Sequence, residues 1–354
     1  MRSPAWLERL LGSALQGGPL DAADGSKLLA SDEELLLEVV AAAARVRRRF
    51  FGARVKLSFL VNVKSGACPE DCAYCSQSRA STADVLKYPW IAPEDAAELA
   101  ERAAAAGARR ICLVAAGRRP SGRDLARAER TIEAIRGCRP ELEVCVSLGF
   151  LREAEAERLR RAGAASYNHN LNTSPDRYGE ICTTHSYADR VATATSVGRA
   201  GLSLCSGAIF GLGESDAEVV EIALALRELE PSSVPVNFLM PFEGTPLDGA
   251  RGLSPRRCLR ILALLRFAFP RTELRLAAGR EIHLRTAQPL ALQIADSIFL
   301  GDYLTSEGQA REDDLAMIRD AGLEVEDSAP PPAGDQPAVA PRRRGPGTGA
   351  AANL

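Results

Sequence analysis

Cys68, Cys72 and Cys75 lie at C-x3-C-x2-C spacing, and no fourth cysteine lies close by. A closed structural zinc site usually has four nitrogen or sulfur ligands, and an electron-transfer iron–sulfur cubane usually has four cysteine ligands. Three thiolates on a four-iron cluster leave one iron without a protein ligand, so that iron can bind a small molecule. We therefore interpret the segment as a cluster site with an open position. The alternatives are chance cysteines in a surface loop and a zinc site completed by a distant residue.

Further cysteines and one arginine interrupt apolar runs that predict β-strands. Cys112, Cys145 and Cys205 lie within three such runs, and Arg275 lies within a fourth. A buried arginine is costly unless an acceptor pairs with it, and soft thiolates near a cation suit a second metal cluster. A single cysteine of this kind is usually a small core residue. The combination of all three cysteines with Arg275 favours a second cluster.

A row of amides occupies another predicted strand. Asn168, Asn170 and Asn172 alternate along it and therefore share one face, while Asn237 lies in a separate β-rich run. If the shared face points into the protein, its amides can bind an amide-like or urea-like ligand. If the face points outward, they are surface polar residues. His169 would then point the other way, and we expect a structural role for it.

Short β-rich runs alternate with helical segments from about residue 54. The β-rich runs cover residues 55–63, 110–115, 142–148, 166–172, 202–210, 234–239, 273–277 and 297–300. This alternation predicts an α/β fold, a (β/α)8 TIM-type barrel. The active site of such a barrel lies at the carboxyl ends of its strands. The three-cysteine segment follows the first strand and should therefore lie at that end.

Helix-start patterns and composition divide the chain further. Ser31 with Glu34 and Ser215 with Glu218 form capping-box patterns, which predict the first turn of a helix. The C-terminal residues are rich in proline, glycine and alanine and lack apolar periodicity, which predicts disorder. The expected divisions are a helical extension at residues 1–50, the barrel at residues 51–327 and a disordered tail at residues 328–354.

The composition is that of an ordinary globular protein. Of the 354 residues 46% are hydrophobic and 25% are charged, with a formal net charge of −2. Nothing in this balance suggests a nucleic-acid or membrane-surface partner, and no apolar run is long enough to cross a bilayer. Nine cysteines, an odd number, occur without a signal-peptide pattern. This favours reduced thiols and metal ligands, and we expect a cytoplasmic protein.

The cysteine spacing, with Tyr74 directly before Cys75, resembles that of the radical S-adenosylmethionine enzymes. In that family the open iron binds S-adenosylmethionine, which electron transfer cleaves to a 5′-deoxyadenosyl radical. The other motifs resemble those of the biotin synthases, from about residue 30 to residue 325. They are GACPEDCAYC at 66–75, YNHNLNTSP at 167–175, CSGAIFGLGE at 205–214, SVPVNF at 233–238, GTPL at 244–247 and RLAAGRE at 275–281, together with the strand cysteines.

The resemblance implies an enzyme that inserts sulfur into dethiobiotin to make biotin, using S-adenosylmethionine and two clusters. The implied ligands of a [4Fe-4S] cluster are Cys68, Cys72 and Cys75. Those of a sulfur-donating [2Fe-2S] cluster are Cys112, Cys145, Cys205 and Arg275, supported by Arg110 and Ser233. The implied contacts of S-adenosylmethionine are Tyr74, Asn172 and Arg190, and those of the substrate are Asn168, Asn170 and Asn237.

The resemblance also implies a homodimer and a reducing partner such as flavodoxin or ferredoxin. Many members of the family have aspartate where this chain has Asn172, so a bond to the cofactor ribose would lack charge assistance. Cys138, Cys182 and Cys258 match no cluster position, and we interpret them as bystanders. One alternative is another radical S-adenosylmethionine enzyme of the same architecture, hydrogenase-maturase-like or mutase-like, which would not need Arg275 with the strand cysteines. Another is a non-enzymatic iron–sulfur or zinc carrier, which would need a complete four-ligand site.

Overall fold

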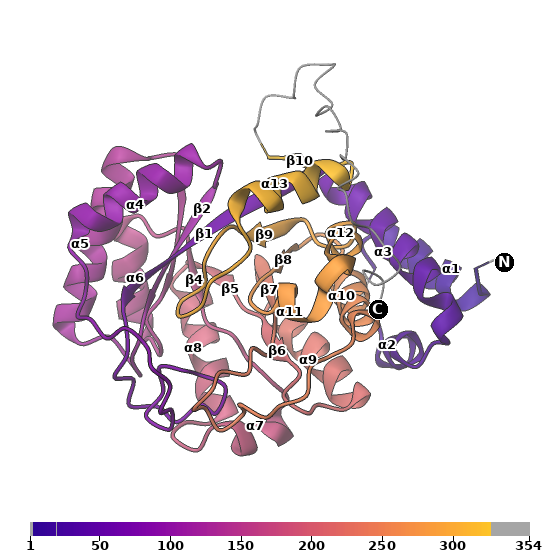
Figure 1. Cartoon of the computed structure of the whole chain (residues 1–354), viewed down its shortest axis with the longest axis horizontal. Helices are drawn as coiled ribbons and strands as arrows, with labels where there is room; N and C mark the ends of the chain where they lie inside the picture. The colour runs from indigo at the N-terminus through magenta and orange to yellow at the C-terminus, as the bar shows by residue number, and fades with distance from the viewer. Residues whose placement is uncertain (1–2, 19, 327–354) are drawn as a thin grey trace, which may run out of the picture.

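The computed structural model describes residues 3–18 and 20–326 and consists of a closed barrel of parallel strands with helices around it (Figure 1). The strands are β1 (Arg54–Lys64), β2 (Arg110–Ala115), β3 (Glu143–Ser147), β4 (Ser166–Asn168), β5 (Ser203–Cys205), β6 (Ala208–Phe210), β7 (Ser233–Phe238), β8 (Glu273–Leu276), β9 (Ser297–Phe299) and β10 (Glu324–Val325). Neighbours follow the order β1-β2-β3-β4-β5-β7-β8-β9, and β1 also pairs with β9, which closes the barrel. The predicted TIM-type fold is confirmed. The tail predicted at residues 328–354 lies outside the described residues.

The helices form the outer layer of the barrel (Figure 1). They are α1 (Ala5–Leu15), α2 (Ala22–Leu29), α3 (Leu36–Phe51), α4 (Pro93–Ala105), α5 (Gly122–Cys138), α6 (Glu153–Ala162), α7 (Pro175–Ile181), α8 (Tyr187–Arg199), α9 (Asp216–Glu228), α10 (Pro255–Ala268), α11 (Arg280–Leu284), α12 (Gln288–Leu292) and α13 (Arg311–Asp320), with the 3-10 turns η1 (Glu33–Leu35) and η2 (Arg285–Ala287). Among the described residues, no helix combines the length and the apolar character needed to span a membrane.

Two of the predicted strands differ most from the sequence pattern. β4 ends at Asn168, and the run predicted at residues 202–210 is divided into β5 and β6. The division falls at Gly207, where the backbone passes very close to β7. A Cβ atom on Gly207 would lie 1.9 Å from the carbonyl oxygen of Pro235. Only glycine permits this approach, so the break in the strand is a consequence of the local packing.

The N-terminal helices lie against one side of the barrel (Figure 1). α1 packs on α3, α3 packs on α10, and α2 contacts α9 and α10. Arg47 of α3 is fully buried, and its guanidinium donates to the carbonyl oxygens of Gly52, of Arg54 at 2.6 Å and of Ala295 at 3.3 Å. These bonds join the end of α3 to the start of β1 and to the segment before β9, where the barrel closes.

The capping box predicted at Ser31 is wrong. Ser31 Oγ donates to the carbonyl oxygen of Leu28 at 2.7 Å, so it satisfies the end of α2 instead of the start of the next helix. The chain then passes through η1, where Glu33 pairs with Arg260 of α10 at 2.8 Å. The first turn of α3 follows at Leu36 and has no side-chain cap.

The capping box predicted at Ser215 and Glu218 is confirmed at the start of α9. The Glu218 carboxylate accepts from Arg177 Nε at 2.9 Å and from the Ser215 N–H at 2.8 Å. These bonds, of which the one from Arg177 has the largest effect, lower the pKa of Glu218 to about 2. The box therefore ties α9 to α7 as well as starting the helix.

Replacing Gly207 by alanine should destabilise the protein by about 1–3 kcal/mol, because the new methyl group would overlap the backbone of β7. Gly137→Ala, in α5, is the matched control, since a Cβ there meets nothing within 4 Å. Its effect should stay within about 1 kcal/mol. Urea unfolding of both variants checks this, and equal midpoints would contradict the close approach.

The stability of the protein should depend on Glu218 in a defined pH window. Because its pKa is depressed in the folded state, Glu218 contributes stability above its ordinary pKa of about 4.3, and this contribution is lost as the pH falls towards 2. In Glu218→Gln the unfolding free energy should be lower at neutral pH and should fall less steeply with acidification. Denaturant unfolding at several pH values between 2 and 7 checks this, and parallel curves for parent and variant would disprove it.

Candidate active site

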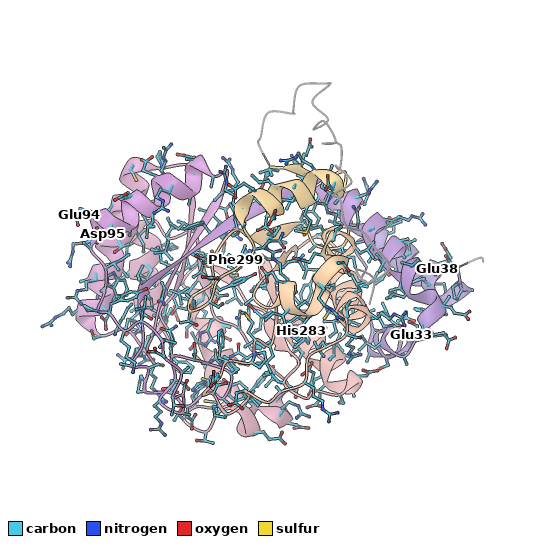
Figure 2. The ribbon with its side chains drawn as sticks, viewed as in Figure 1. Glu33, Glu38, Glu94, Asp95, His283 and Phe299 are labelled. Carbon is cyan, nitrogen blue, oxygen red and sulfur yellow. The ribbon has the colours of Figure 1, made fainter. Side chains whose placement is uncertain are left out.

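A cavity of about 360 Å³ lies at the carboxyl ends of the barrel strands. Phe299 of β9 lies in the barrel interior beside it, whereas Glu94 and Asp95 of α4 lie on the outer surface (Figure 2). The residues of the lining that the sequence analysis singled out are Cys68, Cys72, Tyr74, Cys75, Asn168, Asn170, Asn172, Arg190 and Asn237. The structure therefore brings the first cysteine group and the amides to one cavity.

The loop after β1 is held by hydrogen bonds within itself. Gln77 Oε1 accepts from the Gly66 N–H at 2.8 Å, and the Cys68 N–H donates to the Gln77 carbonyl at 3.2 Å. The Cys75 N–H donates to the Cys72 carbonyl at 3.0 Å, which closes a tight turn. Burial raises the pKa of Cys75 to about 11. All three cysteines are free thiols on one cavity wall, a donor set that suits a thiophilic metal cluster.

A fixed cation and a phenol flank this loop. Arg190 of α8 donates from Nη1 to the carbonyl oxygen of Asn170 at 3.1 Å and from Nε to the hydroxyl of Tyr178. Within the described residues Arg190 forms no salt bridge, so its charge is available to an anionic group in the cavity. Asn172 Nδ2 donates to the hydroxyl of Tyr74 at 2.6 Å. This bond joins the cysteine loop to the segment after β4.

The amides line the cavity, although the strand predicted to carry them is shorter than expected. Because β4 ends at Asn168, no strand face is shared by all three asparagines, and Asn172 adopts a φ of +72°. Asn168 Nδ2 donates to Asn170 Oδ1 at 3.1 Å, and the same oxygen accepts from the Gly207 N–H at 3.0 Å. Asn237 reaches the cavity from β7. The turn after β4, together with these bonds, positions the row.

His169 also reaches the cavity lining, which the alternation of side chains did not predict. The chain leaves the strand at Asn168, so the alternation stops there. The His169 ring packs at 5.3 Å from the ring of Phe150 and 6.5 Å from that of Tyr167. Burial lowers the pKa of His169 well below its ordinary value, so the ring is neutral. This packing is that of a structural residue.

A second group of thiols lies within the barrel. Cys112 of β2 is paired in register with Cys145 of β3, and Cys205 of β5 with Asn168 of β4. The neighbouring Cys112 thiol raises the pKa of Cys145 most, and burial raises it further. The three side chains are buried together against Phe299 and form no disulfide. Three touching free thiols fit a soft metal centre.

Arg275 lies beside this second group, with Nη1 at 3.8 Å from Cys205 Sγ and only 1% of the residue exposed. Its charge is balanced by Glu273, two residues earlier on β8. The same carboxylate accepts from Arg110 Nη1 at 2.7 Å, and Ser233 Oγ accepts from Arg275 Nη2 at 2.8 Å. The network places a buried guanidinium against the thiols.

The sequence analysis missed Glu273. Arg275 needs an acceptor if it is buried, and alternation along β8 places residues 273 and 275 on one face. These two observations together could have identified the glutamate from the sequence.

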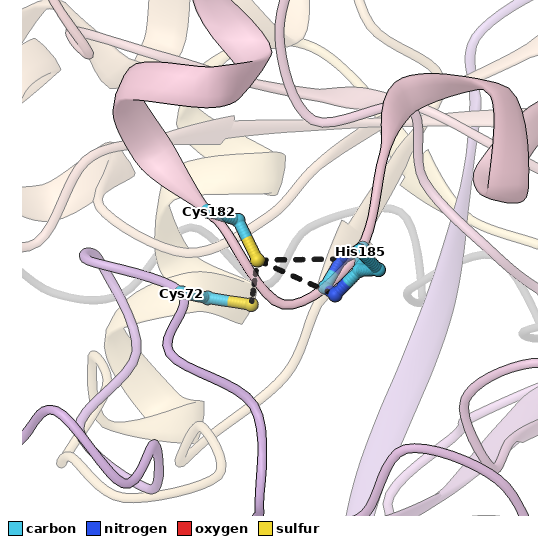
Figure 3. A group of neighbouring side chains, drawn as sticks. All are labelled: Cys72, Cys182 and His185. Atoms are coloured by element: carbon cyan, nitrogen blue, oxygen red, sulfur yellow. Dashed lines mark hydrogen bonds between the residues drawn. The ribbon is translucent and has the colours of Figure 1, made fainter.

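Cys182, which the sequence analysis interpreted as a bystander, lies beside the first cysteine group. Its Sγ is 3.8 Å from Cys72 Sγ and 3.3 Å from Nδ1 of His185 (Figure 3). Cys182 follows directly after α7, far from Cys72 in the sequence, so no spacing rule could have linked them. By contrast, Cys138 is exposed and Cys258 is buried on α10.

Known protein families match most of the chain. Residues 62–226 match the Radical SAM superfamily, and residues 235–324 match the Biotin and Thiamin Synthesis associated domain. Biotin synthase 2 of Frankia casuarinae is 56% identical over 322 residues, which cover 91% of this chain and 89% of that protein. The chain belongs to the biotin synthase family. A second member, from Streptomyces avermitilis, is 58% identical over 86% of this chain and 78% of its own length.

Solved structures show the same fold at low identity. Methylornithine synthase aligns with a TM-score of 0.79 and 21% identity over 89% of this chain and 97% of its own. The FeFe-hydrogenase maturase of Carboxydothermus hydrogenoformans aligns with a TM-score of 0.77 and 21% identity over 90% and 79%. At this identity only the barrel is shared. Membership of the biotin synthase family implies a [4Fe-4S] cluster with S-adenosylmethionine and a second cluster.

Replacing Glu273 by glutamine should destabilise the protein by about 3–5 kcal/mol, because Arg275 would remain buried without a carboxylate partner. The control is Glu101→Gln, which removes the partner of Arg139 in a surface pair. This change should stay within about 1 kcal/mol. Urea unfolding of the cluster-free chains compares the two, and similar midpoints would show that Glu273 does not balance Arg275.

Proposed function

We propose that this chain is a radical enzyme that inserts sulfur into dethiobiotin to make biotin, using S-adenosylmethionine. The family assignment supports this activity. The observation that carries this proposal is the presence of two groups of three free thiols in one barrel. Amide side chains lie between the two groups. Asn168 lines the cavity next to the first group, and its Nδ2 lies 3.4 Å from Cys205 Sγ of the second group.

The family resemblance implies which residues would hold the two clusters, and these positions support that assignment. The [4Fe-4S] cluster would be held by Cys68, Cys72 and Cys75, and the [2Fe-2S] cluster by Cys112, Cys145, Cys205 and Arg275. When bound, the first cluster supplies an electron that cleaves S-adenosylmethionine to a radical, and the second supplies the sulfur atom. The protein provides separate sites for the two groups, one on a loop and one within the strands.

The cofactor-binding residues lie on the wall of the cavity. Arg190 presents a guanidinium that would bind the carboxylate of S-adenosylmethionine. Tyr74 and Asn172, already hydrogen-bonded to each other, would contact its adenosyl group. Asn172 is a neutral amide, so its bond to a ribose hydroxyl would be weaker than that of a carboxylate.

The substrate-binding residues are the amides that face the same cavity, Asn168, Asn170 and Asn237. They provide both donors and acceptors, as the ureido ring of dethiobiotin requires. Apolar side chains such as Leu239, Met240 and Phe242 also line the cavity. They would exclude water from the reacting carbon and protect the radical from side reactions.

The wider setting of the enzyme follows from the family resemblance. We propose a homodimer, a reducing partner such as flavodoxin or ferredoxin, and a cytoplasmic location. We also propose that residues 1–50 form an extension to a barrel domain at residues 51–327, with residues 328–354 as a tail.

The test is the iron and sulfide content of anaerobically reconstituted protein, with Mössbauer spectra, for the parent and for Cys145→Ala. The parent should contain both cluster types. The variant should lose the [2Fe-2S] signal and keep the [4Fe-4S] signal, because Cys145 belongs to the second thiol group and does not line the cavity with the first. Only the parent should then convert dethiobiotin to biotin.

Cys138→Ala provides the matched control, since Cys138 is exposed at the end of α5. It should keep both signals and the activity. A single cluster type that is unchanged by Cys145→Ala would disprove a dedicated sulfur donor. The protein would then be a radical enzyme with another substrate.

A further inference from the structure

His185 lines the active-site cavity, and the proposed function gives it no part. It lies between α7 and α8, and only 1% of its side chain is exposed. Its neighbour in the cavity wall is Arg190, the residue that would bind the carboxylate of S-adenosylmethionine. The side chains of these two residues are in direct contact.

A hydrogen bond of 3.1 Å joins Arg190 Nη2 to His185 Nε2. Because a guanidinium can only donate, Nε2 accepts, and the ring proton is on Nδ1. Nδ1 then donates to the carboxylate of Glu70. The carboxylate thus sets the tautomer in which Nε2 can accept from Arg190.

The His185 ring is held in this orientation by the groups around it. The rings of Phe150 and Tyr178 pack edge-on against it, with centroids 5.0 Å and 5.7 Å away. On the side of Nδ1, the Sγ atom of Cys182 lies 3.3 Å away. The ring therefore has little freedom to turn away from Arg190.

Glu70, which accepts from the ring, belongs to the loop that carries the first cysteine group, between Cys68 and Cys72. Its carboxylate also accepts from Thr184 Oγ1 at 2.6 Å and from Arg118 Nη1 at 3.2 Å, so it is fixed as well. The hydrogen bonds run from this loop through the imidazole to the guanidinium. They tie the position of the guanidinium to the loop that would hold the iron.

The bonds of Arg190 hold it without neutralising it. Its Nε donates to the hydroxyl of Tyr178, and Nη1 donates to the carbonyl oxygen of Asn170 at 3.1 Å. These acceptors and the imidazole are all uncharged, and a guanidinium has more N–H donors than these bonds use. A carboxylate in the place of the imidazole would pair with the cation and compete with an anionic ligand. His185 leaves both the charge and the remaining donors to the ligand.

We propose that His185 is a positioning residue for S-adenosylmethionine. By accepting from Arg190, it holds the guanidinium in the orientation that binds the carboxylate of that molecule, and it does so without touching the molecule itself. This inference rests on the proposed function, in which Arg190 binds the carboxylate.

The first test is equilibrium dialysis of the reconstituted protein, without reductant, against radiolabelled S-adenosylmethionine. His185→Phe removes the acceptor and should weaken binding about tenfold, the loss expected for one hydrogen bond to a charged group. His185→Leu, a second variant without an acceptor, should behave in the same way. His185→Gln carries an amide oxygen that can take the place of Nε2, so it should bind within about threefold of the parent.

A double-variant cycle with Arg190→Leu separates positioning from a general effect on the fold. Arg190→Leu alone should weaken binding by more than about tenfold. In that background His185→Phe should change the affinity by less than about twofold, because the side chain that it positions is gone. The matched control is Arg158→Leu, which removes an arginine from a surface pair with Glu129 and should leave the affinity unchanged.

The cycle distinguishes failure of this inference from failure of the proposed function. If Arg190→Leu binds as tightly as the parent, the cofactor role of Arg190 is wrong, and the role of His185 falls with it. If Arg190→Leu weakens binding and His185→Phe does not, the cofactor role stands and the positioning role is overturned. Equal weakening by His185→Phe in both backgrounds also overturns it. Iron content and circular dichroism identify a variant without cluster or fold, and His185→Leu then replaces His185→Phe in the cycle.

Discussion

The barrel interior depends on one carboxylate shared by two buried guanidinium groups. Glu273 balances Arg275 and also accepts from Arg110, and Ser233 completes the bonds of Arg275. Without these acceptors a cation at this depth would be too costly to bury. The network fixes the direction of the Arg275 side chain. It thereby holds a positively charged guanidinium against Cys205.

The two thiol groups are held in different ways. Cys112, Cys145 and Cys205 lie on strands whose backbones are fixed by neighbours on both sides, so their spacing is set by the sheet register. Cys68, Cys72 and Cys75 lie on a loop whose shape depends on its own hydrogen bonds. A loop can change shape to fit a cluster and the molecule bound at the open position of that cluster. Cysteines on strands, in contrast, keep a constant distance from the cavity. Asn168, at the end of β4, lies between the two groups.

Sequence reasoning identified the barrel, the cysteine groups and the amide row because each rests on a local pattern. Period-two alternation, cysteine spacing and helix caps are all readable within a few residues. It misjudged Ser31 because the end of a preceding helix competed for the same hydroxyl. It could not place Cys182 beside Cys72, since that contact depends on how the turn after α7 folds over the loop after β1. It also extended β4 past Asn168, where the chain leaves the strand.

Closure of the barrel between β1 and β9 has a consequence for synthesis of the chain. β1 can pair with β2 soon after both leave the ribosome, but its other edge pairs with residues 297–299, near the end of the described chain. Until then β1, a strand of 11 residues, exposes an unpaired edge, which can pair with strands of other chains. Contacts between such distant segments also form slowly. The nascent protein is therefore most prone to aggregation in the interval before β9 is made, and chaperones that cover strand edges would act on it then.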